Sequence, residues 1–128
     1  MKIVIDTNVF ISAALSPKGT PAKIIKELAE EERLQLFYTA EIFDEYERVL
    51  SYKRLNIAEE MKTRTLRIIK ELGIVITPIA SVIPMPDETD RIFYDTAKAS
   101  GSILITGNLR HYPQEPFILS PSDFLKLF

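Results

Sequence analysis

The chain opens with a short apolar run that ends at an acidic residue. The β-branched residues Ile-Val-Ile at positions 3–5 follow one another directly, which is typical of a strand buried on both faces of a parallel sheet. Asp6 comes next, and an ionised carboxylate at the end of a buried strand is costly unless a partner satisfies it. Ligands of open α/β sheets bind beyond the carboxyl ends of the strands, so Asp6 is placed to hold a cation or a polar substrate. The alternative is that Asp6 only caps a helix beginning near Val9.

The length and composition of the chain set the class of protein. We expect one globular domain over residues 1–128, because 46% of the residues are hydrophobic and 27% are charged. The sequence contains no cysteine, which excludes a disulfide framework or a thiolate metal site and fits a cytoplasmic protein. It shows neither a signal peptide nor an apolar segment near the ~20 residues that span a membrane. The net charge of −2 means that any nucleic-acid binding rests on a local basic patch.

Strand and helix patterns alternate along the chain. Short apolar runs predict strands at residues 3–5, 34–38, 74–76, 102–105 and 117–119. Helical periodicity and capping residues predict helices at residues 9–15, 20–32, 40–51, 57–72, 87–100 and 120–128. This alternation predicts the α/β class, with a parallel sheet covered by helices on both faces.

Polar residues follow the expected strands at points where a site can form. If the fourth expected strand lies beside the first, Asp6 and the turn at 106–108 share one edge of the sheet. Glu45 lies on the helix that follows the second strand, and Asp87 and Asp90 begin the helix that leads into the fourth. The topology can bring these groups together at the carboxyl edge of the sheet.

The candidate residues are mainly carboxylates. Carboxylates that gather in one place raise each other's pKa, and a hard divalent cation relieves this repulsion. Such an ion can position a phosphodiester, stabilise its developing charge and activate water. A zinc site is not expected, because the chain has one histidine, His111, and no cysteine. No glycine-rich phosphate loop is present, and no nucleophile elbow accompanies His111.

Each of these residues also has a purely structural interpretation. Asp87 and Asp90 favour a helix start through capping and the helix dipole alone. Glu45 has acidic neighbours and could be a solvated helix residue, and Asn108 could be an ordinary turn residue. Asp95 comes five residues after Asp90, so the two do not share a helix face well, and we expect Asp95 at the surface or behind the site.

Four segments of the chain together resemble one family. They are Ile-Val-Ile-Asp-Thr-Asn-Val-Phe at 3–10, Glu-Tyr-Glu-Arg-Val-Leu at 45–50, Asp-Glu-Thr-Asp-Arg-Ile-Phe-Tyr-Asp-Thr-Ala at 87–97 and Leu-Ile-Thr-Gly-Asn-Leu-Arg-His-Tyr-Pro at 104–113. In this order they are similar to the PIN domain family, in particular to small prokaryotic members that are toxins of toxin–antitoxin pairs. The resemblance implies a three-layer α/β/α sandwich around a mostly parallel sheet, and a metal-dependent endoribonuclease that cleaves single-stranded RNA.

The resemblance also implies roles for individual residues. Asp6, Glu45 and Asp90 would be the catalytic acids and would bind Mg²⁺ or Mn²⁺. Asp87 and Asn108 would complete the metal ligands, although Asn108 stands where many members of the family have an aspartate, and it brings no charge. Three further residues would support the site through hydrogen bonds: Thr7, Asn8 and Thr106.

Basic and aromatic residues are the candidates for RNA contact. Arg110 and His111 lie just past the expected site, and Tyr112 could stack on a base. Further lysines and arginines crowd the stretch 53–70, where they could equally form a solvated helix face.

The resemblance implies protein partners as well as RNA. Small proteins of this kind commonly form homodimers and are held inactive by an antitoxin whose tail occupies the site. The apolar loop at 79–85 and the tail at 124–128 could make such contacts, or could belong to the core.

Two other functions stay open from the sequence. A phosphohydrolase of small molecules could use Asp6 as its nucleophile, but the second aspartate that such enzymes carry two residues later is missing. A non-catalytic PIN module could bind RNA or protein through a degenerate metal site, and Asn108 is the main support for it. Metal binding separates the module from the enzymes, and substrate screening separates the two enzymes.

Overall fold

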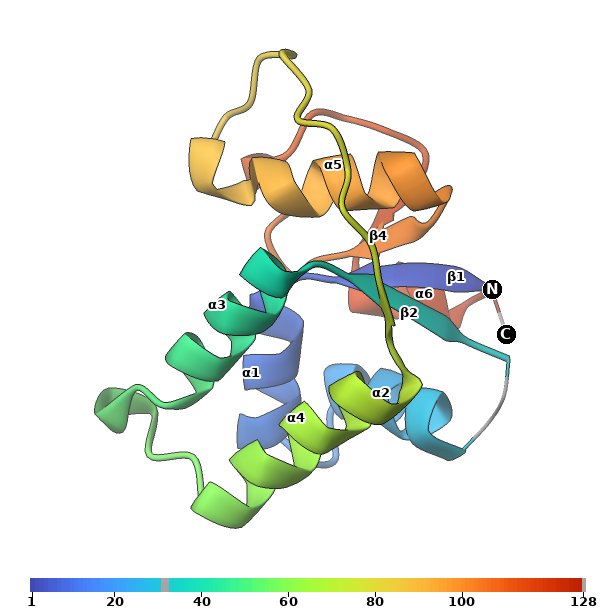
Figure 1. Ribbon diagram of the computed structural model, residues 1–128. Helices are drawn as coiled ribbons and strands as arrows, with labels where there is room; N and C mark the ends of the chain where they lie inside the picture. The colour runs from blue at the N-terminus through green and yellow to red at the C-terminus, as the bar shows by residue number, and fades with distance from the viewer. Residues whose placement is uncertain (31–32, 128) are drawn as a thin grey trace.

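A parallel sheet forms the centre of the molecule. The computed structural model describes residues 1–30 and 33–127. Within them, five parallel strands follow the order β3-β2-β1-β4-β5 (Figure 1). The strands are β1 (Lys2–Ile5), β2 (Gln35–Tyr38), β3 (Ile74–Val75), β4 (Ile103–Ile105) and β5 (Ile118–Leu119). Each expected strand is therefore present, with ends that differ by at most one residue.

Helices cover both faces of the sheet, which confirms the predicted α/β sandwich. In Figure 1, α5 lies above the sheet, where it contacts β1, β2 and β4. On the opposite side lie α1, α2 and α4, and α3 descends from the end of β2 alongside α1. The short α6 packs against α2 and β5. The helices are α1 (Thr7–Leu15), α2 (Thr20–Glu30), α3 (Ala40–Leu50), α4 (Glu59–Leu72), α5 (Arg91–Ser100) and α6 (Pro121–Leu125).

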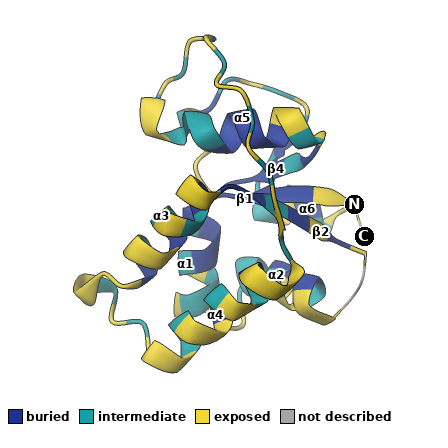
Figure 2. Cartoon of the chain, in the orientation of Figure 1, coloured by how far each residue is buried: buried dark blue, intermediate teal, exposed yellow. Residues whose placement is uncertain are grey.

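The central position of β1 explains the unbroken apolar run near the start of the chain. Ile3, Val4 and Ile5 are completely buried, and the strand is dark blue beyond its exposed start in Figure 2. The register pairs Ile3 with Leu36 of β2 on one side and with Ile103 of β4 on the other. Because helices cover both faces, an apolar side chain is favoured at every position of this strand.

Two helix starts near the candidate site differ from the expectation. α1 begins at Thr7, directly after Asp6, rather than near Val9. The helix expected from residue 87 begins as a 3₁₀ turn, η2 (Glu88–Asp90), and continues as α5 from Arg91. Both acids of this second segment therefore lie before the α-helix itself.

Further differences are small. Two more 3₁₀ turns are η1 (Lys53–Leu55) and η3 (Leu109–His111), and α4 begins at Glu59, two residues later than expected. The expected helix ends at Glu32 and Phe128 lie outside the described residues. Among the described residues, no helix is both long and apolar enough to cross a membrane.

The strand order places the ends of β1 and β4 side by side. Ile5 pairs with Ile105, and the backbone N–H of Asp6 donates to the Ile105 carbonyl oxygen at 2.9 Å. Asp6 and Thr106, the residues that follow the two strands, are therefore neighbours at the carboxyl edge of the sheet.

Candidate metal centre

Asp6 stands at the N-cap position of α1 but does not serve as a cap. Within the described part of the chain, its side chain makes no capping hydrogen bond to the helix. Instead, its Oδ2 accepts hydrogen bonds from the hydroxyls of Thr106 and Tyr112, each at 2.8 Å. The side chain is buried, and this burial raises the pKa of Asp6 despite the hydroxyl hydrogen bonds that lower it.

Glu45 approaches the same junction from α3. Its Oε2 accepts a hydrogen bond from the hydroxyl of Thr7, the first residue of α1. The neighbouring Tyr46 is completely buried and donates its hydroxyl to the carbonyl oxygen of Ile5. These two contacts hold α3 against the end of β1, so the Glu45 carboxylate lies beside the residues that flank Asp6. The Glu45 side chain is 25% exposed, so it is partly and not fully solvated.

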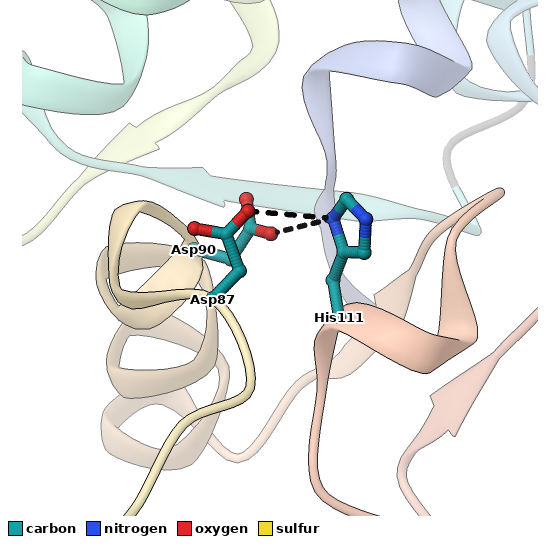
Figure 3. A group of neighbouring side chains, drawn as sticks. All are labelled: Asp87, Asp90 and His111. Carbon is teal, nitrogen blue, oxygen red and sulfur yellow. Dashed lines mark hydrogen bonds and ion pairs between the residues drawn. The ribbon is translucent and has the colours of Figure 1, made fainter.

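Asp87, Asp90 and His111 form a second group of polar side chains (Figure 3). The Nδ1 atom of His111 lies 3.0 Å from Asp90 Oδ2 and 3.8 Å from Asp87 Oδ2. Each residue offers one ligand atom, and the three atoms lie within 4.8 Å of one another. The group joins the start of α5 to the turn η3, which are far apart in sequence.

The two aspartates of this group differ in their electrostatics. Asp87 caps η2 by accepting from the backbone N–H of Thr89 at 3.0 Å, and its contacts with Thr89 lower its pKa. Asp90 makes no capping hydrogen bond in the described residues. Burial and the charge of Asp6 raise the pKa of Asp90 to about 6. Because the charge of Asp6 acts on Asp90, the residues around Asp6 and the group of Asp87, Asp90 and His111 lie close enough to interact electrostatically.

The turn after β4 is fastened to the start of α1. The backbone N–H of Gly107 donates to Asn8 Oδ1 at 2.9 Å, and the backbone N–H of Asn108 donates to Thr106 Oγ1 at 3.0 Å. Thr106 in turn donates to Asp6, so one chain of hydrogen bonds crosses the carboxyl edge. Asn108 itself is exposed beside this edge.

The donor chemistry of these residues fits a divalent cation. Carboxylate oxygens from Asp6, Glu45 and Asp90 are the ligands that Mg²⁺ and Mn²⁺ prefer. The raised pKa values of Asp6 and Asp90 mark negative charge that the protein alone compensates poorly. An imidazole nitrogen beside Asp87 and Asp90 suits Mn²⁺ better than Mg²⁺.

The interpretation of Tyr112 was wrong, and of the two places expected for Asp95 the structure excludes the surface. Tyr112 cannot stack on a base in this arrangement, because only 4% of it is exposed and its hydroxyl is bonded to Asp6. Asp95 is buried rather than at the surface, and its Oδ2 accepts from the backbone N–H of Ser81 at 3.0 Å. Asp95 thus fastens the loop before η2. No local sequence signal separates such a buried tyrosine from an exposed one.

The surface beside the acidic residues is hollowed. A hollow of about 440 Å³ is lined by residues of the turn after β4, of η3 and of the start of α6: Gly107, Asn108, Leu109, Arg110, His111 and Ser120. Arg110 is exposed there, next to His111, so a positive side chain flanks the carboxylates.

Known proteins are similar to this chain in sequence or in fold. The uncharacterized protein MJ1680 of Methanocaldococcus jannaschii is 33% identical over 111 residues, which cover 84% of this chain and 71% of that protein. Among solved structures, VapBC2 from Rickettsia felis bound to a DNA fragment from their promoter contains a chain of similar fold. The TM-score is 0.57 at 16% identity, over 94% of this chain and 97% of the other. At that identity the likeness concerns the fold alone.

A family comparison covers most of the chain. The sequence profile of the PIN domain family matches residues 2–110, from β1 into η3. The matched part contains the carboxylates Asp6, Glu45, Asp87 and Asp90, and also Asn108. The chain therefore belongs to the PIN domain family.

Proposed function

We propose that this chain is a metal-dependent endoribonuclease that cleaves single-stranded RNA. The observation that carries the proposal is that Asp6 and Asp90 lie near each other at the carboxyl edge of the sheet, where the adjacent residues His111 and Tyr112 contact Asp90 and Asp6, and the charge of Asp6 raises the pKa of Asp90. Such a pair, with Glu45 beside the same junction, is costly for an apo protein and suited to a cation.

In the proposed mechanism, the chain's own residues orient the reacting groups. Asp6, Glu45 and Asp90 would hold Mg²⁺ or Mn²⁺, with Asp87 and Asn108 completing the set. When bound, the ion would neutralise charge on the phosphodiester and favour attack by water. Thr106 keeps the Asp6 carboxylate in place through its hydroxyl, as Thr7 does for Glu45, and Asn8 holds the turn that carries Asn108.

Arg110 is the proposed contact for the RNA backbone. It is exposed at the hollow beside the carboxylates, and His111 lies between it and the acidic group. Arg110→Glu should flatten the salt dependence of RNA binding by about 0.7 or more in the log–log slope, since each lost phosphate contact on a single strand contributes that much. Binding of a non-cleaved RNA measured across salt concentrations tests this. A slope unchanged from the wild type would remove Arg110 from the interface.

Cleavage of a labelled single-stranded RNA tests the proposed activity. We expect cleavage with Mn²⁺ or Mg²⁺, none with EDTA, and little on a duplex of the same sequence. Glu45→Gln serves as the matched variant, because it keeps the size of the side chain and removes its charge; we expect it to lose most of the cleavage. Cleavage that persists in EDTA, or that Glu45→Gln leaves unchanged, would contradict the proposal.

The proposed partners are a cognate antitoxin protein and a second copy of this chain. The fold shared with a chain of the VapBC2 complex supports the first partner. Exposed aliphatic side chains could contribute to either contact: Ile79 is 93% exposed and Val82 is 97% exposed. Of the tail, Phe124 is completely buried and belongs to the core. We place the protein in the cytoplasm, which its lack of cysteine suits.

A non-catalytic module is the second candidate function. Asn108 favours it, because this residue brings no charge where many members of the family have an aspartate. The cleavage assay separates the two candidates, since the module would bind RNA without cutting it in any divalent metal.

A further inference from the structure

Two adjacent residues of the chain reach two different carboxylates of the candidate site. His111 places its Nδ1 3.0 Å from Asp90 Oδ2, and Tyr112 donates its hydroxyl to Asp6 Oδ2 at 2.8 Å. Asp6 and Asp90 come from separate elements, the end of β1 and the end of η2. The end of η3 and the residue that follows it thus contact both acids.

The two hydroxyl hydrogen bonds to Asp6 reach the same carboxylate oxygen. Thr106 and Tyr112 both donate to Oδ2, so this oxygen is held from two directions. A carboxylate oxygen with two strong hydroxyl donors has little lone-pair capacity left for a cation. Neither hydroxyl bonds to Oδ1, which is therefore the better placed oxygen of Asp6 for a cation.

Among the described residues, the Tyr112 hydroxyl makes no hydrogen bond other than the one to Asp6. The ring is 4% exposed and belongs to the hydrophobic core, a role that a phenylalanine would fill equally well. The oxygen that the hydroxyl reaches lies 106 residues earlier in the chain. Tyr112 also lies beyond residue 110, where the match to the family profile ends.

We propose that Tyr112 is a positioning residue of the metal site, whose hydroxyl fixes Oδ2 of Asp6 and so directs Oδ1 to the cation. The inference rests on the proposed function, because it assumes that Asp6 binds a divalent ion. Groups that orient a metal-binding carboxylate typically change metal affinity by 10- to 100-fold when they are removed. Thr106 shares the task, so we expect the lower end of that range for Tyr112 alone.

The test compares two tyrosine-to-phenylalanine variants of the full chain. Tyr112→Phe removes the hydroxyl on Asp6, and Tyr94→Phe removes the hydroxyl of another buried tyrosine, which donates to Glu115 at 3.2 Å. Free Mn²⁺ is measured by electron paramagnetic resonance during a titration. We expect the dissociation constant to rise about tenfold in Tyr112→Phe and to stay at the wild-type value in Tyr94→Phe.

A second pair of variants tests whether Tyr112 acts through Asp6. In an Asp6→Asn background, Tyr112→Phe should cause no further loss of Mn²⁺ affinity, because its target is already altered. Additive losses would overturn the proposal. A Tyr112→Phe protein without cooperative unfolding would also overturn it, since the hydroxyl would then serve folding rather than the site.

The remaining outcomes separate this inference from the proposed function. If the wild type binds Mn²⁺ and Tyr112→Phe binds it equally well, the inference fails and the nuclease proposal stands. If the wild type binds no Mn²⁺, both fail together.

Discussion

Asp6 and Asp87 each stand at the residue before a helical segment, yet the fold uses the two carboxylates in opposite ways. Asp87 is partly exposed and bonds to both the backbone N–H and the hydroxyl of Thr89, two residues later. Asp6 is buried and leaves its helix uncapped within the described chain; its partners, Thr106 and Tyr112, come from the other end of the sequence.

The difference shows how a capping residue can be told from a candidate site residue. A cap satisfies its carboxylate locally, which lowers its pKa, as at Asp87. A carboxylate that is buried without its cap keeps a raised pKa, as Asp6 and Asp90 do. Such a group lowers the stability of the metal-free protein, and a bound cation can restore it.

The largest expected effect is on RNA cleavage, which replacement of Asp6 should lower far more than replacement of Asp87. Asp6→Asn should lower RNA cleavage by at least about 100-fold, because it removes a charge at the centre of the proposed site. Asp87→Asn should lower cleavage by less than about tenfold, since Asp87 lies at the rim and is partly engaged as a cap. Single-turnover cleavage at saturating Mn²⁺ measures both, with circular dichroism as the control for folding. Equal losses of cleavage in the two variants would contradict the different roles assigned to Asp6 and Asp87.

The hydroxyl that bonds to Asp6 should contribute more to the free energy of unfolding than the hydroxyl that bonds to Asp87. Thr106→Val keeps the shape of the side chain and removes a donor to a buried carboxylate, so we expect the free energy of unfolding to fall by about 2 kcal/mol. Thr89→Val removes only the hydroxyl donor to the partly exposed Asp87, whose bond to the Thr89 N–H remains, and should cost clearly less. Urea denaturation in EDTA measures both. A larger loss in Thr89→Val would contradict the distinction.

The contribution of Asp90 to the stability of the protein should depend on pH. Its pKa rises from an ordinary value of 3.8 to about 6 in the folded protein. Between these values the folded state binds more protons than the unfolded state, so the stability that Asp90 contributes falls as the pH rises and is lost above about pH 6. Asp90→Asn should therefore stabilise the metal-free protein at pH 7.5 by on the order of 1 kcal/mol, after allowance for solvent screening.

Thermal unfolding of wild type and Asp90→Asn in EDTA at pH 4 and pH 7.5 checks this prediction. The gain should appear at pH 7.5 and be much smaller at pH 4. A gain that is the same at both values would show that repulsion around Asp90 is not the cause.

Local patterns predicted the elements that carry the site. The run Ile3–Ile5 indicated a buried strand, and the structure places it at the centre of the sheet with Asp6 at its end. The alternation of strands and helices indicated the parallel topology, which is why the ends of β1 and β4 could be expected together. The buried strand follows from the pattern of adjacent residues, and the parallel topology follows from the order of strands and helices; both can be read from the sequence.

The partners of individual side chains were not predictable in the same way. Tyr112 looked like a surface aromatic next to Arg110, but it packs inward and reaches across 106 residues to Asp6. The spacing of Asp95 from Asp90 left open whether it lies at the surface or behind the site, and the structure buries it under the loop before η2. Each of these contacts depends on how distant segments pack, and no local periodicity encodes that.

A calorimetric titration with Mn²⁺ tests the central claim most directly. We expect the wild type to bind Mn²⁺, Asp6→Asn to bind it at least about tenfold more weakly, and Asp87→Asn to stay much closer to the wild type. Asp6→Asn binding with wild-type affinity would contradict the account, because the buried carboxylate held by Thr106 and Tyr112 would then not be a metal ligand.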